Sequence, residues 1–245
     1  DGPKRVEALF GETTVCVITT SPPGLQVSID GSDYTEPQSR RWLQGSSHTL
    51  SVQDLVEDDY IRYSFNSWNR SLFRTFSYTV KTSVDTDTIT AFFDTEYKLT
   101  VNTNHSTASG TGWYDDNKQA SFRVMDETIN NSSSRYQFNR WEGMGYNLLT
   151  EEWESGNSSY SGDDISYYVT MNNPIIETAV WDTLYKLTVT QNIDTAGIVS
   201  KKSGQDWLKK NVKDTLTAVP AENGSYEFDH WSGDIGSNDP TNSTI

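Results

Sequence analysis

The residue types that usually carry out catalysis or bind metals are few in this 245-residue chain, and they are scattered. The single cysteine is Cys16 and the three histidines are His48, His105 and His230, so no two of them have the spacing of a metal-ligand pair. We find no glycine-rich phosphate loop and no nucleophile elbow. Carboxylates are abundant, but the separation that a catalytic pair needs is set by the fold. The sequence therefore predicts a non-catalytic segment with no cofactor and no metal.

Three acidic pairs could offer oxygen ligands to calcium: Asp85 with Asp87, Asp115 with Asp116, and Asp163 with Asp164. Calcium takes about six to eight oxygens, and none of these pairs stands in the spaced loop of a known calcium motif. Aspartates at turns also accept hydrogen bonds from nearby backbone N–H groups, and we favour that interpretation here.

Two kinds of binding or modification site are compatible with the sequence. Exposed aromatic rings stack on sugars, so Trp153 and Tyr160, in an insertion with no counterpart elsewhere in the chain, are candidates for a ligand face. N-glycosylation requires an asparagine two residues before Ser or Thr. Seven asparagines meet this rule: Asn69, Asn104, Asn130, Asn131, Asn157, Asn223 and Asn242.

A repeated aromatic motif indicates the strands that hold these candidate residues in place. Residues 136–143 have the pattern Tyr-x-Phe-x-x-Trp-x-Gly, residues 226–233 repeat it, and residues 63–68 form an earlier, weaker copy. Side chains alternate between the two faces of a strand, so the Tyr and the Phe share a face, and the Trp needs a bulge or a strand end to join them. We interpret the nine rings as core residues rather than as a ligand platform: Tyr63, Phe65, Trp68, Tyr136, Phe138, Trp141, Tyr226, Phe228 and Trp231.

A second repeated phrase gives the period. Residues 90–101 (TAFFDTEYKLTV) match residues 178–189 (TAVWDTLYKLTV), and Ala91 and Ala179 are 88 residues apart. We interpret the phrase as the last strand of one module, a two-residue joint and the first strand of the next module. A joint that short predicts a semi-rigid rod.

The modules that follow from this period have the boundaries 13–95, 96–182 with an insertion at 148–164, and 183–245 without a last strand. Residues 1–12 align with the closing strand of a preceding module, because residues 6–13 match residues 89–96. Either the chain continues beyond Ile245 and supplies its own closing strand, or the N-terminal strand is donated to the next subunit by β-strand addition. The possible donor residues are Val6, Ala8, Leu9 and Phe10.

Composition supports an all-β chain with solvated faces. The net charge is −15, the mean hydropathy is −0.66 and aromatic residues make up 12% of the chain, which is far more than a disordered acidic tail contains. The acidity argues against nucleic acid and anionic membranes as partners, and no apolar run is long enough to span a membrane. We predict a rod of tandem small antiparallel β-sandwich (Ig-like) modules. Between Val15 and Val17, we expect Cys16 to be buried.

Two resemblances cover most of the chain. The segment SPPGLQVSIDG at 21–31 resembles the PEGA-type β module of prokaryotic surface proteins. From Tyr97 onward, the order Tyr-x-Leu-Thr-Val, Gly-Trp-Tyr, Tyr-x-Phe-x-x-Trp-x-Gly and Thr-Ala-x-Trp is similar to the internalin-B-type repeat of secreted bacterial and archaeal proteins. The sequence Trp68-Asn69-Arg70 departs from the usual form of this motif.

These resemblances imply an extracellular repeat protein with no catalytic residues to transfer. The expected function is therefore structural, in a surface layer, stalk, adhesin or filament, and the expected partners are other copies of the chain, other surface proteins or glycans. The alternatives are a carbohydrate- or ligand-binding β module and an accessory region of a secreted enzyme.

Overall fold

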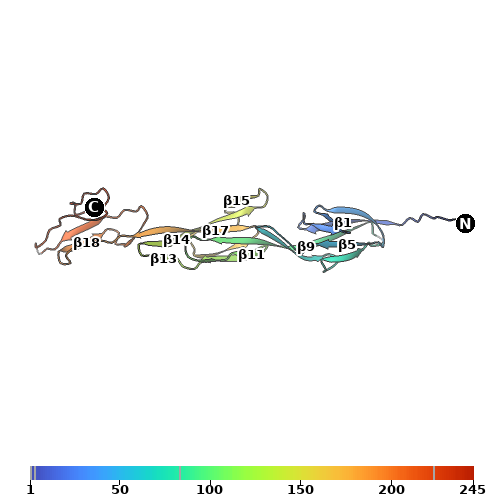
Figure 1. Cartoon of the computed structure of the whole chain (residues 1–245), viewed down its shortest axis with the longest axis horizontal. Coiled ribbons are helices and arrows are strands. Elements are labelled where there is room, and N and C mark those ends of the chain that lie inside the picture. The colour runs from blue at the N-terminus through green and yellow to red at the C-terminus, as the bar shows by residue number, and fades with distance from the viewer. Residues whose placement is uncertain (1, 3, 83, 223) are drawn as a thin grey trace.

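The computed structural model describes residues 2, 4–82, 84–222 and 224–245. None of these residues is helical, and the described chain consists of strands joined by turns and loops, so the predicted all-β class is confirmed. In Figure 1 the strands follow one another along the long axis of the molecule, and the two termini lie at opposite ends. No described helix has the length and apolarity needed to cross a membrane.

The first hydrophobic core lies between two layers of strands. One layer is the sheet β3-β2-β5-β8, and the other is built by β4, β1, β9, β7 and β6. Cys16, Ile18, Leu50, Trp68 and Ile89 fill the space between them. The strand bounds are β1 (Thr13–Ser21), β2 (Val27–Ile29), β3 (Ser32–Tyr34), β4 (Gln38–Leu43), β5 (Ser47–Val52), β6 (Leu55–Glu57), β7 (Ile61–Trp68), β8 (Thr75–Thr79) and β9 (Thr86–Asn102).

Local sequence explains these first strands. In β1 every second residue is buried, as the alternation of side chains between the two faces of a strand predicts. Cys16 and Ile18 are fully buried, so the predicted burial of Cys16 is confirmed. Asp30 and Gly31 have φ values of 51° and 84°, so they form the tight turn that connects β2 to β3. Asp and Gly adopt this left-handed backbone at low cost, which is why they occur together in two-residue hairpin turns.

The second core repeats this arrangement. The sheet β10-β12-β16 faces the layer that contains β13, β14, β17 and β9, and Leu99, Phe122, Trp141 and Ile175 are fully buried between them. The strand bounds are β10 (Ala108–Ser109), β11 (Gly112–Asp115), β12 (Lys118–Val124), β13 (Thr128–Asn130), β14 (Ser134–Asn147), β15 (Glu152–Ser155), β16 (Ser166–Met171) and β17 (Ile175–Lys186).

The remaining described residues contain fewer strands. The strands β18 (Gly197–Lys201) and β20 (Leu216–Pro220) pair with each other, a bridge joins Thr217 to Thr244, and β19 (Trp207–Lys209) pairs with the end of β17. Trp231 is buried among these elements.

The two-residue joint expected between successive cores is wrong. β9 is one continuous strand of 17 residues: Ile89 and Ala91 are buried in the first core, and Leu99 is buried in the second. Continuity is possible because β9 keeps antiparallel partners through the expected joint, where Glu96 pairs with Arg62 of β7 on one side and with Asp115 of β11 on the other. The sequence phrase therefore marks one strand that serves two cores.

The pairing around the long strands follows a fixed plan. β9 has β1 as a parallel neighbour, β7 as an antiparallel neighbour and β11 at its C-terminal end. β17 has β9, β14 and β19 in the same three positions. The registers also agree, because Cys16 pairs with Asp87 and the equivalent Leu99 pairs with Ile175. The chain thus repeats a structural unit as well as a sequence phrase.

Candidate functional site

The aromatic motif contains a β-bulge in both complete units. The register between β7 and β9 shifts between Phe65 and Ser67, and the register between β14 and β17 shifts between Phe138 and Arg140. The extra residue in each bulge is an asparagine, which bonds an aspartate on the long strand. Of the two possibilities that the spacing left open, a bulge or a strand end, the structure has the bulge, which brings Trp68 onto the face of Phe65 and Trp141 onto the face of Phe138.

Each tryptophan of the motif also fixes the loop that follows it. The indole N–H groups of Trp68, Trp141 and Trp231 donate hydrogen bonds to the backbone carbonyls of Arg74, Asp164 and Asn242, at 3.3, 3.0 and 3.1 Å. The backbone N–H groups of the same tryptophans donate to Ser71, Gly162 and Pro240, at 2.7, 2.7 and 2.8 Å. The sequence suggested burial for these rings, but it contained no signal for this second role.

The third copy of the motif differs from the other two. Residues 226–231 do not form a strand, and Tyr226 is 38% exposed, so this ring is not part of a core as expected. Phe228 is half-buried and still packs against Trp231, with 5.5 Å between the ring centroids. Trp231 keeps its burial because its two loop hydrogen bonds do not depend on the missing strand pairing.

The insertion in the second unit is the most unusual feature of the chain. After Trp141 the chain extends β14 to Asn147, turns back as β15, and returns across the sheet through residues 156–164. Gly143 and Gly145 permit this return, because an added Cβ atom would overlap the backbone oxygen of Tyr160 or of Asn157. The glycine of the motif in this unit, Gly143, lies within β14 and permits close packing of the returning segment.

A buried carboxylate lies beneath the returning segment. The side chain of Glu177, on β17, is fully buried beside Gly143, and its Oε1 accepts a hydrogen bond of 2.8 Å from the backbone N–H of Tyr160. Its Oε2 has no hydrogen-bond partner among the described residues. Burial raises the pKa of Glu177 to about 7, and the single hydrogen bond from Tyr160 only partly opposes this rise. Nothing in the sequence distinguished Glu177 from the other acidic residues.

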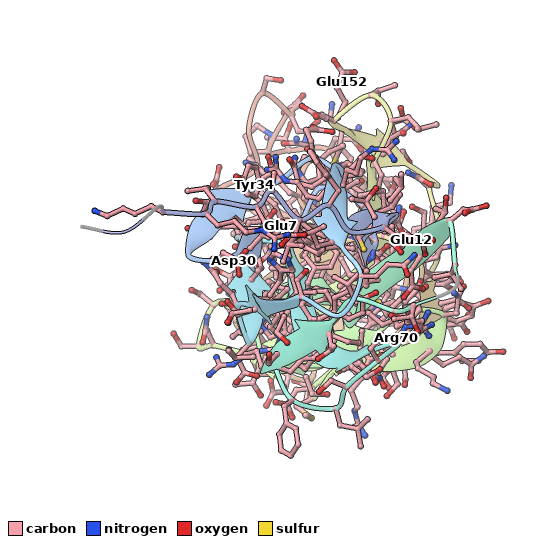
Figure 2. The ribbon with its side chains drawn as sticks, turned by 90° about the vertical axis from the view of Figure 1, so that its right-hand side faces the viewer. Glu7, Glu12, Asp30, Tyr34, Arg70 and Glu152 are labelled. Atoms are coloured by element: carbon pink, nitrogen blue, oxygen red, sulfur yellow. The ribbon has the colours of Figure 1, made fainter. Side chains whose placement is uncertain are left out.

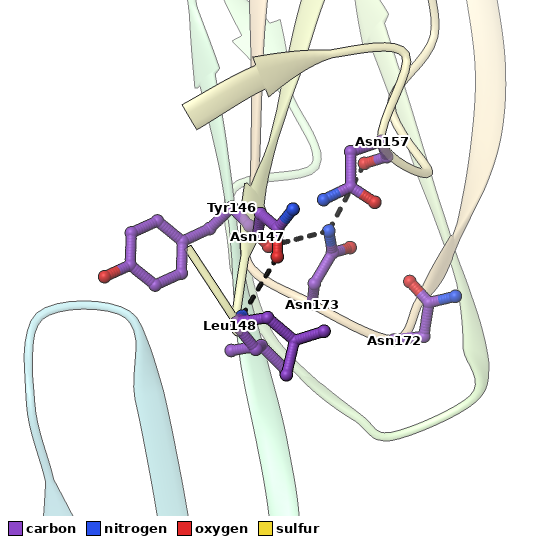
Figure 3. Close-up of a pocket in the computed structure, with 7 residues that line it drawn as sticks. Tyr146, Asn147, Leu148, Asn157, Asn172 and Asn173 are labelled. Atoms are coloured by element: carbon purple, nitrogen blue, oxygen red, sulfur yellow. Dashed lines mark hydrogen bonds between the residues drawn. The ribbon is translucent and has the colours of Figure 1, made fainter. Parts of the chain in front are cut away.

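Beside this carboxylate, amide side chains line a shallow pocket of about 260 Å³ (Figure 3). The buried Asn173 donates from Nδ2 to the backbone oxygens of Tyr146, at 3.0 Å, and Asn157, at 3.3 Å. The pocket offers neutral hydrogen-bonding groups and apolar contact. Its lining residues are Tyr146, Asn147, Leu148, Leu149, Asn157, Asn172 and Asn173.

The two aromatic residues proposed as a ligand face lie in different clusters. Trp153 packs against Tyr146 and against Tyr60, which precedes β7 of the first unit, with 5.3 Å between ring centroids in both cases. Tyr160 instead stacks on Tyr167 at 3.8 Å, and Tyr167 stacks on Tyr168 at 5.3 Å. Trp153 therefore braces the insertion against the first unit, and the exposed rings are those of Tyr167 and Tyr168.

A second buried carboxylate lies in the first unit and is fully paired. Asp87 accepts hydrogen bonds from Tyr78 at 2.7 Å and Arg70 at 2.6 Å, and Lys81 lies 3.3 Å away. Burial alone would raise the pKa of Asp87, but the hydrogen bonds from Tyr78 and Arg70 and the charge of Arg70 hold it below its usual value. Burial also raises the pKa of the Cys16 thiol, which lies 3.9 Å from Tyr78 and is therefore a protonated core residue.

The histidines take part in separate local contacts. His48 stacks on Trp42 and bonds Asp30 at 2.7 Å, and His105 stacks on Tyr136. Within residues 2, 4–82, 84–222 and 224–245, no three His, Cys, Asp or Glu side chains come together as a metal site would require.

The glycosylation candidates differ in their surroundings. The side chain of Asn69 is occupied, because its Nδ2 donates to the oxygen of Thr88 and its Oδ1 accepts from the N–H of Thr90. Asn130 accepts a hydrogen bond from Arg135, and Asn157 is half-buried at the pocket. Asn104, Asn131 and Asn242 are exposed, and Asn223 lies outside the described residues.

Comparisons with known proteins give no family. No family model, no curated protein and no solved structure matches the chain.

Proposed function

We propose that the chain is a non-catalytic structural segment of an extracellular repeat protein, in which successive β units form a stiff, extended array. The observation that supports this proposal best is that β9 is continuous between two cores. A long strand that serves both cores resists bending, because rotation at Glu96 would break its ladder to β7 and β11 at the same time.

Side chains reinforce the same place. Arg62 forms two hydrogen bonds to Glu96, at 2.8 and 2.9 Å, and its guanidinium lies 4.8 Å from the centre of the Trp113 ring. Trp153 adds its contact with Tyr60 from the insertion. A planar guanidinium that makes two parallel bonds and also packs on an aromatic ring favours one orientation, so these contacts support a fixed angle between the units.

Solution scattering tests the stiffness. We expect the wild-type chain to give a narrow distribution of overall molecular length with a large maximum dimension. Insertion of Gly-Gly-Ser-Gly between Thr95 and Glu96 should reduce the average length and broaden the distribution. The matched control is the same insertion between Leu149 and Thr150, at the exposed tip of the insertion. If wild type and the Thr95 variant scatter alike, the units already tumble freely and the proposal fails. Antibody labelling of intact source cells tests the extracellular location.

The second candidate function is binding of a carbohydrate, and two separate features favour it: the exposed rings of Tyr167 and Tyr168, and the amide-lined pocket. Aromatic faces and neutral amides suit the apolar faces and hydroxyl groups of sugars. Screening against immobilised glycans tests this function. Binding that disappears in Tyr168→Ala, or in Trp153→Ala with its folding intact, would replace the structural interpretation.

A further inference from the structure

The strands at the edges of the sheets differ in how they are protected. An edge strand presents unpaired N–H and C=O groups, and natural proteins guard it with charges, proline, short length or a covering segment. Most edge strands of this chain have such a guard. Charged residues occur in β3, β4, β6, β11, β15, β18 and β19. β10 and β13 have only two and three residues, and residues 243–245 bond along β20.

Two edge strands have no such guard among the described residues, and they occupy the same place in the two complete units. β8 ends the sheet β3-β2-β5-β8 directly before β9, and β16 ends the sheet β10-β12-β16 directly before β17. Their sequences, TFSYT and SYYVTM, contain no charged residue. Within the part of the chain that the structure describes, β8 pairs with β5 alone and β16 with β12 alone. Each complete unit therefore has one open, uncharged edge.

The backbone groups that reach the open edge of β16 follow from its bonds to β12. The N–H of Val124 donates to the oxygen of Ile165, at 3.4 Å, so every second residue from Ile165 onward faces β12. The residues between them point to the open edge and form what we call the open row: Ser166, Tyr168 and Thr170. The N–H of Asn172 donates to the oxygen of Thr170 at 3.1 Å, and no described strand lies beside the row.

The charge of the chain restricts what can approach another copy of it. The net charge is −15. Figure 2 looks onto the N-terminal end of the molecule and shows carboxylates on different sides, such as Glu152 at the top and Asp30 on the left. Two copies therefore repel each other over much of their surface. The open row is a stretch where they can meet without bringing carboxylates together.

We propose that a second copy of the chain pairs with the first through β16, in antiparallel register about a two-fold axis at Tyr168. Ser166 of each copy then lies opposite Thr170 of the other, and the open rows supply both the donors and the acceptors of the new ladder. The same register places Asp164 opposite Asn172, so no carboxylate faces another along the strand. This inference goes beyond the proposed structural function, because it gives the extended array a lateral partner.

The side chains favour β16 over β8 as the contact. Tyr168, at the centre of the open row, is 55% exposed, and a tyrosine opposite a tyrosine stabilises an antiparallel pair. In β8 the N–H of Val52 donates to the oxygen of Arg74, so the central residue with outward backbone groups is Ser77, which has no ring. We therefore assign the contact to β16, and β8 provides the matched control.

Disulfide trapping tests the register. Facing residues of an antiparallel pair have Cα atoms about 5.5 Å apart, within the range of a disulfide. Tyr168→Cys should therefore give covalent dimers on oxidation, while Cys16 stays buried. Ser166→Cys alone should not, because the two copies of this position are offset by about 14 Å along the strands. A mixture of Ser166→Cys and Thr170→Cys chains should give heterodimers. Equal yields of dimer from Tyr168→Cys and Ser166→Cys would overturn the proposal.

A charge on the open row tests the contact itself. Tyr168→Lys places two ammonium groups opposite each other, so it should weaken self-association of the 245-residue chain by at least about tenfold in sedimentation experiments. The ring of Tyr168 is exposed, so circular dichroism should show an unchanged fold. Ser77→Lys, on β8, should leave association unchanged. If Ser77→Lys abolishes association and Tyr168→Lys does not, β8 carries the contact and the assignment to β16 is wrong.

The oligomeric state separates this proposal from the proposed function. A wild-type chain that stays monomeric at every concentration would overturn the pairing through β16. The proposed function would survive that result, because scattering from the dilute chain measures the stiffness of a single copy. A flexible chain that still dimerises through Tyr168 would overturn only the proposed function.

Discussion

The buried carboxylate of Glu177 predicts an unusual pH dependence of stability. The pKa of this group is about 7 in the folded chain against an ordinary value of 4.5, so the folded state holds the proton more tightly than the unfolded state. Its contribution to stability is complete below pH 4.5, falls as the pH rises towards 7, and is constant and lower above 7. At 1.36 kcal/mol for each pKa unit, the loss is about 3 kcal/mol.

Replacing Glu177 with Gln isolates this effect, because the amide keeps the shape and the acceptor for the N–H of Tyr160 but does not titrate. The free energy of unfolding, from urea titrations at a series of pH values between 4 and 8.5, should be similar for the two chains at pH 4. It should favour Glu177→Gln by about 3 kcal/mol at pH 8. The exposed Glu152→Gln is the matched control and should show no such difference. A difference between wild type and Glu177→Gln that does not vary with pH would refute the reasoning.

Two substitutions and one analysis of glycosylation test other parts of the structure. Trp141→Ala removes a fully buried ring that packs against Phe138 on one side and Phe122 on the other. It should lower the free energy of unfolding of the second unit by about 3 to 5 kcal/mol, measured by denaturation. A loss below about 1 kcal/mol would contradict the role of Trp141 in the core. Gly145→Ala should displace the insertion from β14, seen as faster hydrogen exchange at residues 156–164, with protection of the first core unchanged. In a host that glycosylates, mass spectrometry should find Asn104 modified and Asn69 unmodified; a modified Asn69 on folded chain would contradict its hydrogen bonds.

The sequence was sufficient to predict those features of the fold that depend on neighbouring residues in the chain. The alternation in β1 and the Asp30-Gly31 turn follow from side-chain geometry and backbone preference, and both are present. The spacing also indicated that Trp68 joins the face of the core Phe only through a bulge or a strand end, and the structure contains the bulge. These features depend on residues close together in the chain.

The features that sequence did not predict depend on distant partners. The continuity of β9 is decided by β7 and β11, which supply hydrogen bonds across the expected joint. The contact of Trp153 with Tyr60 joins residues from two units, and the burial of Glu177 follows from the path of the insertion. A single sequence carries no signal for such pairings, so the contact between Trp153 and Tyr60 could not be predicted.

The tryptophan hydrogen bonds have a consequence for how this fold can vary. The residue whose carbonyl accepts the indole N–H lies 6 positions after Trp68, 23 after Trp141 and 11 after Trp231. Despite these different lengths, each loop is held by the same two hydrogen bonds, one from the indole N–H and one from the backbone N–H of the tryptophan. Because both ends of the loop are fixed by one residue of the sheet, the length and sequence between them are free to change at small entropic cost. We therefore expect this loop to accept insertions of different length without a change in the core beneath it.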